Sequence, residues 1–311
     1  MQRIIDGFLY EGKVIPDAWD IRKFEVNGHV EISARNVIAW SEVQYVGAYV
    51  RDGDGFKGAP TAENLAKWAA WDAADALERK QASIKRSARR AKTMCRRVIK
   101  AEAFNELLTL TTRDNQTDRE VAKKQFAEWF RRMKRALGTF RFCASFEKQK
   151  RGAMHVHVAT HKLPEVATHK GVKIKAWELG TRIWRDIVGP YPFHGPLQPG
   201  AAFPVVTNGL CFVGGRSPTG APRSMHKLST GRMASYVSKY ILKDCEDNPD
   251  EKNRYSRSNG TVIPPSTVVR LVGLTLSEVI SMAFELQPGS VVISHALGRF
   301  DDGYWLVTEP G

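Results

Sequence analysis

Two neighbouring stretches with different hydrophobic periods constrain the fold of this chain most. FNELLTLTTRDN (104–115) is rich in leucine and β-branched residues and predicts a strand. The stretch 117–137 then repeats apolar residues at helical spacing, and Thr117 with Glu120 has the pattern of a capping box. The apolar positions are Ala122, Phe126, Trp129, Phe130, Met133 and Leu137. A basic face lies opposite them, so we expect an amphipathic helix packed on a sheet.

The chain beyond this helix continues the same alternation of elements. FRFCASFEKQ (140–149) and MHVHVATHK (154–162) predict two strands of an antiparallel hairpin. A helix is expected at 174–187, a strand near 203–213 and a helix at 230–243. The resulting order of strands and helices predicts an α+β fold, with a mostly antiparallel central sheet and flanking helices.

The two ends of the chain are less regular in pattern. Residues 1–60 are mixed and turn-rich, whereas 61–100 predicts one long helix or two. We therefore expect three parts: an N-terminal accessory region at 1–100 that ends in a basic helix, a central domain at 101–260, and a C-terminal extension at 261–311.

Positive charge is concentrated in the middle of the chain. The sequence has 47 Lys+Arg and 33 Asp+Glu, a net charge of +14. Residues 79–151 hold 22 basic and 7 acidic residues, a net of +15, so they carry all of the excess. Such a run is a solvated face in many proteins, but a one-sided block is also typical of phosphate binding. The expected DNA contacts are Arg89, Arg90, Lys92, Arg96, Arg97, Arg254 and Arg257.

Several classes of protein are excluded by what the sequence lacks. It has no apolar run of 18 or more residues, so we expect no membrane span, and its first residues do not predict a signal peptide. Its four cysteines form no CxxC pair, which excludes a zinc ribbon and makes a disulfide framework an unfavoured alternative. A cytoplasmic location fits these features.

A histidine pair in the second strand of the hairpin is the first candidate site. His155 and His157 are two residues apart, so on a strand they point to the same face and can share one metal ion. A turn of three or five residues would place Glu147 opposite His157 and Gln149 opposite His155, whereas a turn of four would point both away. We favour Glu147 as third ligand because its carboxylate adds charge; His161 lies further along the strand. The alternative is a pair of histidines on a half-exposed strand.

A tyrosine pair in the last predicted helix is the second candidate site. Tyr236 and Tyr240 are four residues apart, so their rings lie along one helix face, which Lys239 borders and Lys243 continues. Packing into the core is the alternative. A tyrosine hydroxyl attacks a phosphodiester only when its phenolate is favoured, and both a lysine charge and a metal ion would favour it. Such an attack would transfer the phosphoryl group to tyrosine and release a 3′-hydroxyl.

Three segments in order resemble the rolling-circle replication initiators of the HUH endonuclease superfamily. They are LLTLTTRDN (107–115), EKQKRGAMHVHVATH (147–161) and YVSKYILKD (236–244). The nearest resemblance is to replication-associated proteins of filamentous phages and related single-stranded-DNA replicons. RSARRAK (86–92) and NRYSRSNG (253–260) add to it, so that it covers about residues 86–260.

This resemblance implies a function for each motif. It implies the HUH endonuclease fold, a ferredoxin-like or RRM-like α+β arrangement, for the domain at 101–260. It implies that His155 and His157 bind Mg²⁺ or Mn²⁺ with Glu147, that Tyr236 and Tyr240 are the nucleophiles, and that Lys239 contacts the scissile phosphate. The substrate would be single-stranded DNA at a replication origin, in the cytoplasm of a bacterial host. No GxxxxGK[ST] motif occurs, so a host helicase is expected as well as a host polymerase.

Three other functions remain open from the sequence. An HUH transposase or relaxase would use the same residues. A non-catalytic nucleic-acid-binding regulator would keep the basic surface without the chemistry. A metal-dependent hydrolase of small molecules is disfavoured by the +15 block.

Overall fold

The chain forms two compact units in a computed structural model. One unit comprises Arg86–Ile263, and the other joins Met1–Lys85 to Pro264–Gly311. The structure describes residues 2–5, 8–45, 51–52, 55–56, 62–191, 206–213, 228–247, 249, 253–298 and 303–311. Among these residues no helix combines the length and apolarity that crossing a bilayer requires.

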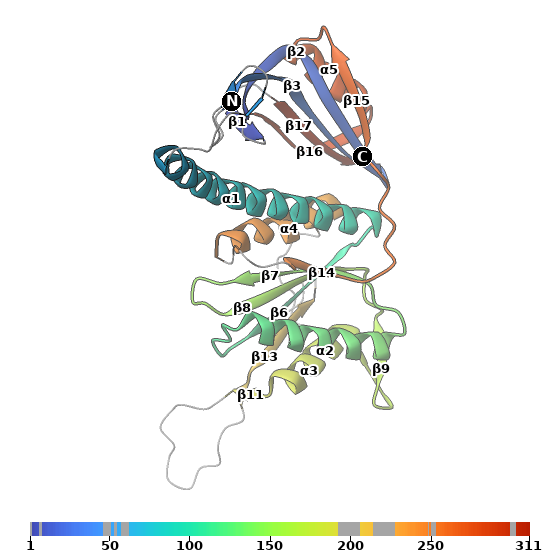
Figure 1. The fold of residues 1–311 in the computed structure, drawn as a ribbon. Coiled ribbons are helices and arrows are strands. Elements are labelled where there is room, and N and C mark those ends of the chain that lie inside the picture. The colour runs from blue at the N-terminus through green and yellow to red at the C-terminus, as the bar shows by residue number, and fades with distance from the viewer. Residues whose placement is uncertain are drawn as a thin grey trace. The chain divides into compact units, whose positions relative to one another are not determined.

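A five-stranded antiparallel sheet forms the centre of the unit Arg86–Ile263 (Figure 1). Its strand order is β13-β6-β8-β7-β14, so β8 lies in the middle and β14 at one edge. The strands are β6 (Glu106–Thr112), β7 (Phe142–Lys148), β8 (Met154–Thr160), β13 (Gly209–Val213) and β14 (Tyr255–Arg257). Shorter strands lie outside this sheet: β9 (Val166–His169) with β10 (Val172–Lys175), and β11 (Pro190–Tyr191) with β12 (Val206–Thr207).

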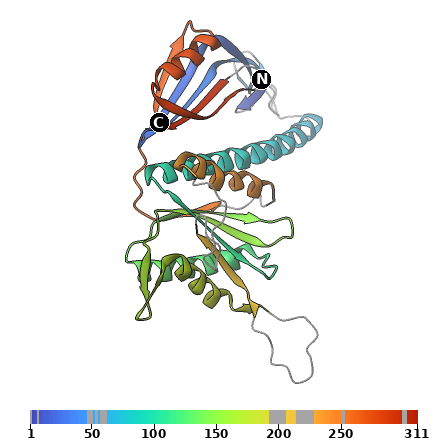
Figure 2. The same cartoon turned by 180° about the vertical axis from the view of Figure 1, so that it is seen from behind.

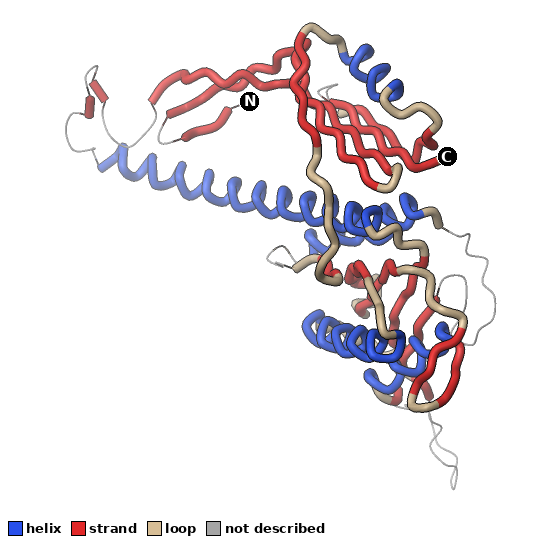
Figure 3. Tube along the Cα trace, turned by 90° about the vertical axis from the view of Figure 1, so that its right-hand side faces the viewer, coloured by secondary structure: helices blue, strands red, loops and turns tan. Residues whose placement is uncertain are grey.

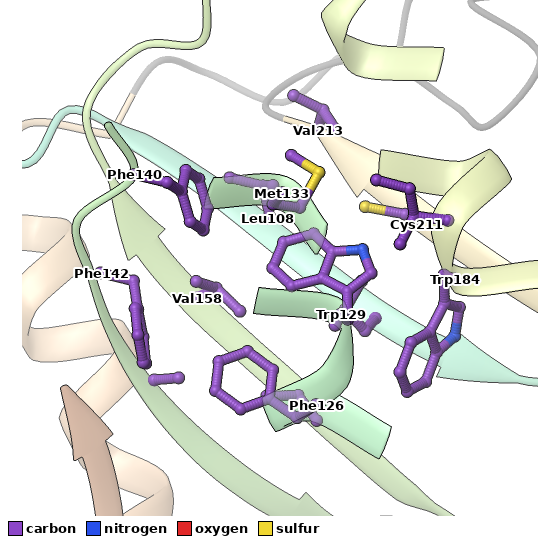
Figure 4. Close-up of a cluster of buried hydrophobic side chains, with 14 of the residues drawn as sticks. Leu108, Phe126, Trp129, Met133, Phe140, Phe142, Val158, Trp184, Cys211 and Val213 are labelled. Carbon is purple, nitrogen blue, oxygen red and sulfur yellow. The ribbon is translucent and has the colours of Figure 1, made fainter. Parts of the chain in front are cut away.

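Helices cover both faces of this sheet (Figures 1 and 2). On one face lie α2 (Arg119–Leu137) and α3 (Ala176–Val188), over a core in which Phe126 and Trp129 are almost completely buried (Figure 4). The other face is covered by α4 (Thr230–Asp247) and the last turns of α1 (Ala62–Ala101). The predicted α+β class, with a mostly antiparallel sheet and flanking helices, is confirmed.

The start of α2 differs from the predicted capping box by one residue. The side chain of Asp118, not Thr117, caps the helix, because it accepts hydrogen bonds from the backbone N–H of Glu120 (2.8 Å) and Val121 (3.1 Å). The expected apolar face is present, since Ala122, Phe126, Trp129 and Met133 are buried and Phe130 and Leu137 are partly buried against the same core.

The β7–β8 hairpin has a register that differs from the expected one. Residues 149–153 connect the strands, and Glu147 lies opposite His155. Ser145, rather than Glu147, is the residue opposite His157. The predicted face is nevertheless right, because a shift of two positions leaves Glu147 on the side of both histidines.

Residues 1–60 contain long strands, so their interpretation as turn-rich was wrong. In the second unit, β2 (Phe8–Val26) pairs with β3 (His29–Tyr45), and strands from the C-terminal part complete an antiparallel sheet (Figure 3). The remaining elements of this unit are β1 (Gln2–Ile5), β4 (Arg51–Asp52), β5 (Gly55–Phe56), β15 (Thr267–Val272), α5 (Leu276–Glu285), β16 (Ser290–Leu297) and β17 (Gly303–Pro310). Helix α5 packs against this sheet through Val279 and Ala283, beside Tyr304 and Leu306.

An ion pair near the end of α1 makes stability of the Arg86–Ile263 unit depend on pH. Arg141 donates two hydrogen bonds to Glu102, one of them at 2.7 Å, and another to Thr261. Burial alone would raise the pKa of Glu102, but its hydrogen bonds with Arg141 and Thr261 and the Arg141 charge outweigh burial and lower this pKa.

We expect this ion pair to stabilise the fold above pH 4.5, the ordinary pKa of a glutamate, and to be lost as the pH falls through the lower folded-state value. The variant Glu102→Gln should therefore lose less unfolding free energy than the wild type between neutral and acidic pH. Urea unfolding at a series of pH values measures this difference. Equal acid dependence in the two proteins would refute the assignment.

Candidate metal and tyrosine site

Strand β8 holds both histidines on the sheet face that α4 covers. His157 is buried and His155 is half-buried, and both share this face with Ala159, which packs in the core beneath α4. Across the hairpin, the Nε2–H of His157 donates a hydrogen bond of 2.9 Å to Glu147 Oε2. Ligand atoms of Glu147, His155 and His157 all lie within 4.8 Å of one another. This cluster could hold a metal ion.

The protonation states of these side chains suit metal binding at neutral pH. Burial, together with the neighbouring charges of His157 and Arg151, lowers the pKa of His155 to about 4, so its imidazole is neutral. Burial would raise the pKa of Glu147, but its interactions with His157 and Lys243 outweigh that effect and lower it. Two imidazoles and a carboxylate are a mixed donor set, which suits Mn²⁺ and other divalent metals that accept nitrogen ligands.

A threonine on the neighbouring strand holds the far side of the His157 ring. Thr109, on β6, lies directly opposite His157, and its hydroxyl is 3.3 Å from His157 Nδ1. A hydroxyl both donates and accepts, so Thr109 can support either tautomer of this imidazole. Contacts of this kind fix the ring orientation of metal-ligating histidines.

Helix α4 brings both tyrosines against His157. The Tyr240 ring stacks on the imidazole with centroids 4.4 Å apart, and the Tyr236 ring meets it edge-on at 5.4 Å. The two tyrosine rings are 5.4 Å apart. The helix is anchored to the sheet near this point, because Ser145 on β7 donates a hydrogen bond of 2.8 Å to the carbonyl of Val237. The two predicted sites are therefore one cluster.

The tyrosines differ in their surroundings. Tyr240 is buried, and burial, followed by its interactions with Tyr236 and Glu147, raises its pKa above the ordinary value of a phenol. Tyr236 is only half-buried. Of the two hydroxyl-bearing side chains, Tyr236 is thus the more accessible to a bound strand.

Two lysines complete the cluster. The ammonium of Lys239 lies 4.4 Å from the centroid of the Tyr236 ring and 4.7 Å from that of Tyr240. One turn further along α4, Lys243 Nζ donates to Glu147 Oε1 at 3.3 Å and to the Lys148 carbonyl at 3.2 Å. Lys239 was a predicted site residue. The role of Lys243 was not, although its spacing already placed it on the tyrosine face.

The rivals of Glu147 lie elsewhere. Gln149 is in the turn after β7, where its side-chain oxygen accepts a hydrogen bond of 3.3 Å from Arg151. His161 is exposed beyond the end of β8, near Glu102 and the Phe104 ring. Neither belongs to the cluster of ligand atoms around His157.

The predicted DNA-contact residues are placed unequally. Arg89 and Arg90 on α1 and Arg257 on β14 are exposed, while Lys92, Arg96 and Arg97 on α1 are half-buried. Arg254 is buried, and its guanidinium lies 3.7 Å from the carboxylate of Asp244. We therefore no longer expect Arg254 to contact DNA, because its charge faces the interior of the fold.

Asp244 is a buried residue that the sequence did not single out. It forms ion pairs with both Arg119 on α2 and Arg254, and the Arg119 guanidinium also lies over the Phe146 ring. The side chains of all three charged residues are at most 10% exposed. Asp244 is four residues from Tyr240, so this group fixes the end of α4 close to the tyrosines.

Comparison with known proteins supports a replication role. Residues 105–193 match a family model of replication-associated proteins, the ORF2 family. This segment contains Thr109, Glu147 and both histidines and ends before α4. No curated protein and no solved structure matches the chain.

Proposed function

We propose that this protein is a rolling-circle replication initiator, an HUH endonuclease that nicks and joins single-stranded DNA through a 5′-phosphotyrosine. The observation that carries the proposal is the contact of both tyrosine rings with His157, which is itself hydrogen-bonded to Glu147. A packed core has no requirement for two imidazoles, a carboxylate and two phenols in one place. The family match over residues 105–193 favours replication over transposition or conjugation.

His155, His157 and Glu147 are the residues that would hold a divalent metal ion, Mn²⁺ or Mg²⁺. When bound, the ion would polarise the scissile phosphate as a Lewis acid. Two neutral imidazoles with one carboxylate favour Mn²⁺ over Mg²⁺, because Mg²⁺ prefers oxygen ligands.

The side chains of α4 would carry out the covalent step. The Tyr236 oxygen attacks the phosphorus, its proton is lost to water, and the bond from phosphorus to the 3′-oxygen breaks. The 3′-oxygen takes up a proton and leaves as a hydroxyl, while the 5′ phosphate stays on the tyrosine. Lys239, whose charge lies over both rings, favours the phenolate and the approach of the phosphate. Tyr240 would take the second transfer, which rejoins the displaced strand.

The partners follow from this reaction. The substrate would be single-stranded DNA at an origin, with Arg89, Arg90, Lys92, Arg96, Arg97 and Arg257 contacting its phosphates. The released 3′-hydroxyl would prime a host polymerase, and a host helicase would unwind the duplex, in the bacterial cytoplasm.

A denaturing protein gel tests the proposal. The protein is incubated with a labelled single-stranded origin fragment and Mn²⁺, and labelled DNA should remain attached to the protein band. The attachment should disappear with EDTA and in the variants His155→Ala and His157→Ala. DNA that is retarded on a native gel but never cleaved or attached would instead support a non-catalytic regulator.

The Thr109 contact predicts a change in metal affinity. Thr109→Val keeps the shape of the side chain and removes the hydroxyl next to His157 Nδ1. We expect Mn²⁺ to bind about 10- to 100-fold more weakly, measured by isothermal titration calorimetry. Thr111→Val, on the same strand, is the matched control, because the Thr111 hydroxyl donates to the Thr112 carbonyl and not to a histidine. Equal affinity in both variants would contradict this role of Thr109.

A further inference from the structure

A groove lies on the opposite side of the sheet from the tyrosine cluster, between α2 and the edge strand β14. Its volume is about 800 Å³, within the roughly 300–1,000 Å³ typical of ligand sites. Phe130, Phe142 and Phe146 are among its lining residues, and the Phe130 and Phe142 ring centroids are 4.5 Å apart. Phe130 is half-buried, so part of an aromatic surface remains open in the groove.

The charged residues of the groove are mostly basic. Lys123, Lys134, Arg141 and Arg257 line it, against one acid, Glu120. Lys123 pairs with Glu120 at 2.9 Å, and Arg141 pairs with Glu102. Among the residues that the structure describes, Lys134 and Arg257 form no ion pair, so two positive charges remain for an external anion.

Polar side chains lie beside the aromatic surface. Ser256 and Asn259 also line the groove, and Asn259 is exposed. An asparagine amide can donate and accept hydrogen bonds at once, as recognition of a base edge requires. Aromatic rings with basic residues beside them are typical of single-strand nucleic-acid binding.

The groove is close to the tyrosine cluster along the same strand. Phe146 lines the groove, and its neighbour Glu147 belongs to the metal-ligand cluster on the other face. Since β14 is the outermost strand beyond β7, a strand of DNA has one sheet edge to pass between the two faces.

We propose that this groove takes an unstacked base of the single-stranded DNA that flanks the cleaved bond, with Phe130 against the base and Lys134 and Arg257 near its phosphates. The inference rests on the proposed single-stranded substrate, but it concerns binding and not cleavage. A protein side chain as occupant would find the same apolar floor, yet it would leave the two basic residues without an anion.

Base-dependent binding tests the proposal. A Tyr236→Phe/Tyr240→Phe protein is titrated without metal against a fluorescein-labelled oligo-dT and against an abasic strand of equal length. Fluorescence anisotropy should show that Phe130→Ala weakens dT binding about tenfold and leaves abasic-strand binding unchanged. Asn259→Ala, at an exposed position, should weaken dT binding in the same selective way.

The matched control is Leu137→Ala, which truncates a half-buried residue of the same helix that packs on the same core outside the groove. It should leave both affinities unchanged. A strand that carries 5-iodouracil provides a measurement without a groove variant: its crosslinks should map to groove residues of α2 or of 253–259.

Two results would overturn the proposal. One is an equal loss of dT and abasic binding in both Phe130→Ala and Asn259→Ala, and the other is crosslinks that map only outside the groove. These outcomes are independent of the nuclease proposal. Selective binding without any nicking would support the groove and refute the nuclease, and nicking without base-selective binding would do the reverse.

Discussion

The Tyr236→Phe protein is expected to cleave a single-stranded origin roughly 10³-fold more slowly than the wild type, or more slowly still, because it lacks the attacking oxygen. Tyr240→Phe should retain first cleavage within about tenfold, since Tyr240 is the buried partner and only supports the neighbouring ring. It should, however, fail in the second transfer that rejoins the strand. Single-turnover cleavage and strand-joining assays with labelled DNA measure the two steps separately.

Metal binding provides the control for both tyrosine variants. Neither phenol belongs to the ligand cluster, so Mn²⁺ affinity should stay near that of the wild type. The assignment of the first step to Tyr236 is contradicted if Tyr240→Phe abolishes first cleavage and Tyr236→Phe does not.

Removal of the Asp244 carboxylate is expected to destabilise the Arg86–Ile263 unit by about 3–5 kcal/mol, because it leaves two buried guanidinium groups without their shared anion. Hydrogen exchange of the buried amides in α2 and α4 measures the loss in this unit directly. Because Arg119 holds α2 and Arg254 follows α4, both helices should lose protection in Asp244→Ala.

The matched control is Glu178→Ala, which breaks the more exposed Glu178–Arg182 pair on α3. Surface pairs within one helix contribute only about 0.3–0.5 kcal/mol, so this variant should be nearly neutral. Similar losses in the two variants would show that the buried charge group has no special weight.

The part of the fold between residues 104 and 243 could be predicted because each element has a strong local pattern. The helical spacing of Phe126, Trp129 and Met133 and the alternation around His155 and His157 depend on no distant residue. The register of the hairpin could not be predicted, because it depends on which residues the turn contains. The side-chain parity alone was enough to place Glu147 with the histidines.

The long N-terminal strands were missed for two physical reasons. The partners of β3 include β17, at residues 303–310, so the pairing is not local. The ladder between β2 and β3 is also irregular between Ile15 and Trp19, where Pro16 interrupts the pattern. At this bulge, the Asn36 amide donates to the carbonyls of Ile15 and Pro16, each at 3.2 Å, and so satisfies backbone groups that pairing leaves open.

The site was predictable in its residue types and not in its surroundings. The spacing of Tyr236 and Tyr240 fixed their common helix face, but the pattern of α4 could not show which sheet residue they would meet. Their contact with His157, the anchoring of α4 by Ser145 and the Asp244 ion pairs all join residues about 80 or more positions apart. Arg254 shows the converse, because a basic residue in a polar segment is indistinguishable from a surface residue until its partner is known.

The most direct test of the account is to identify the residue that carries the DNA after cleavage. The attached product formed with Mn²⁺ is digested with protease and nuclease, and the modified peptide is sequenced by mass spectrometry. We predict a nucleotide joined through its 5′ phosphate to Tyr236. Attachment to a residue outside α4, or complete cleavage with free 5′ phosphates and no attached peptide, would contradict a tyrosine nucleophile beside the histidine cluster.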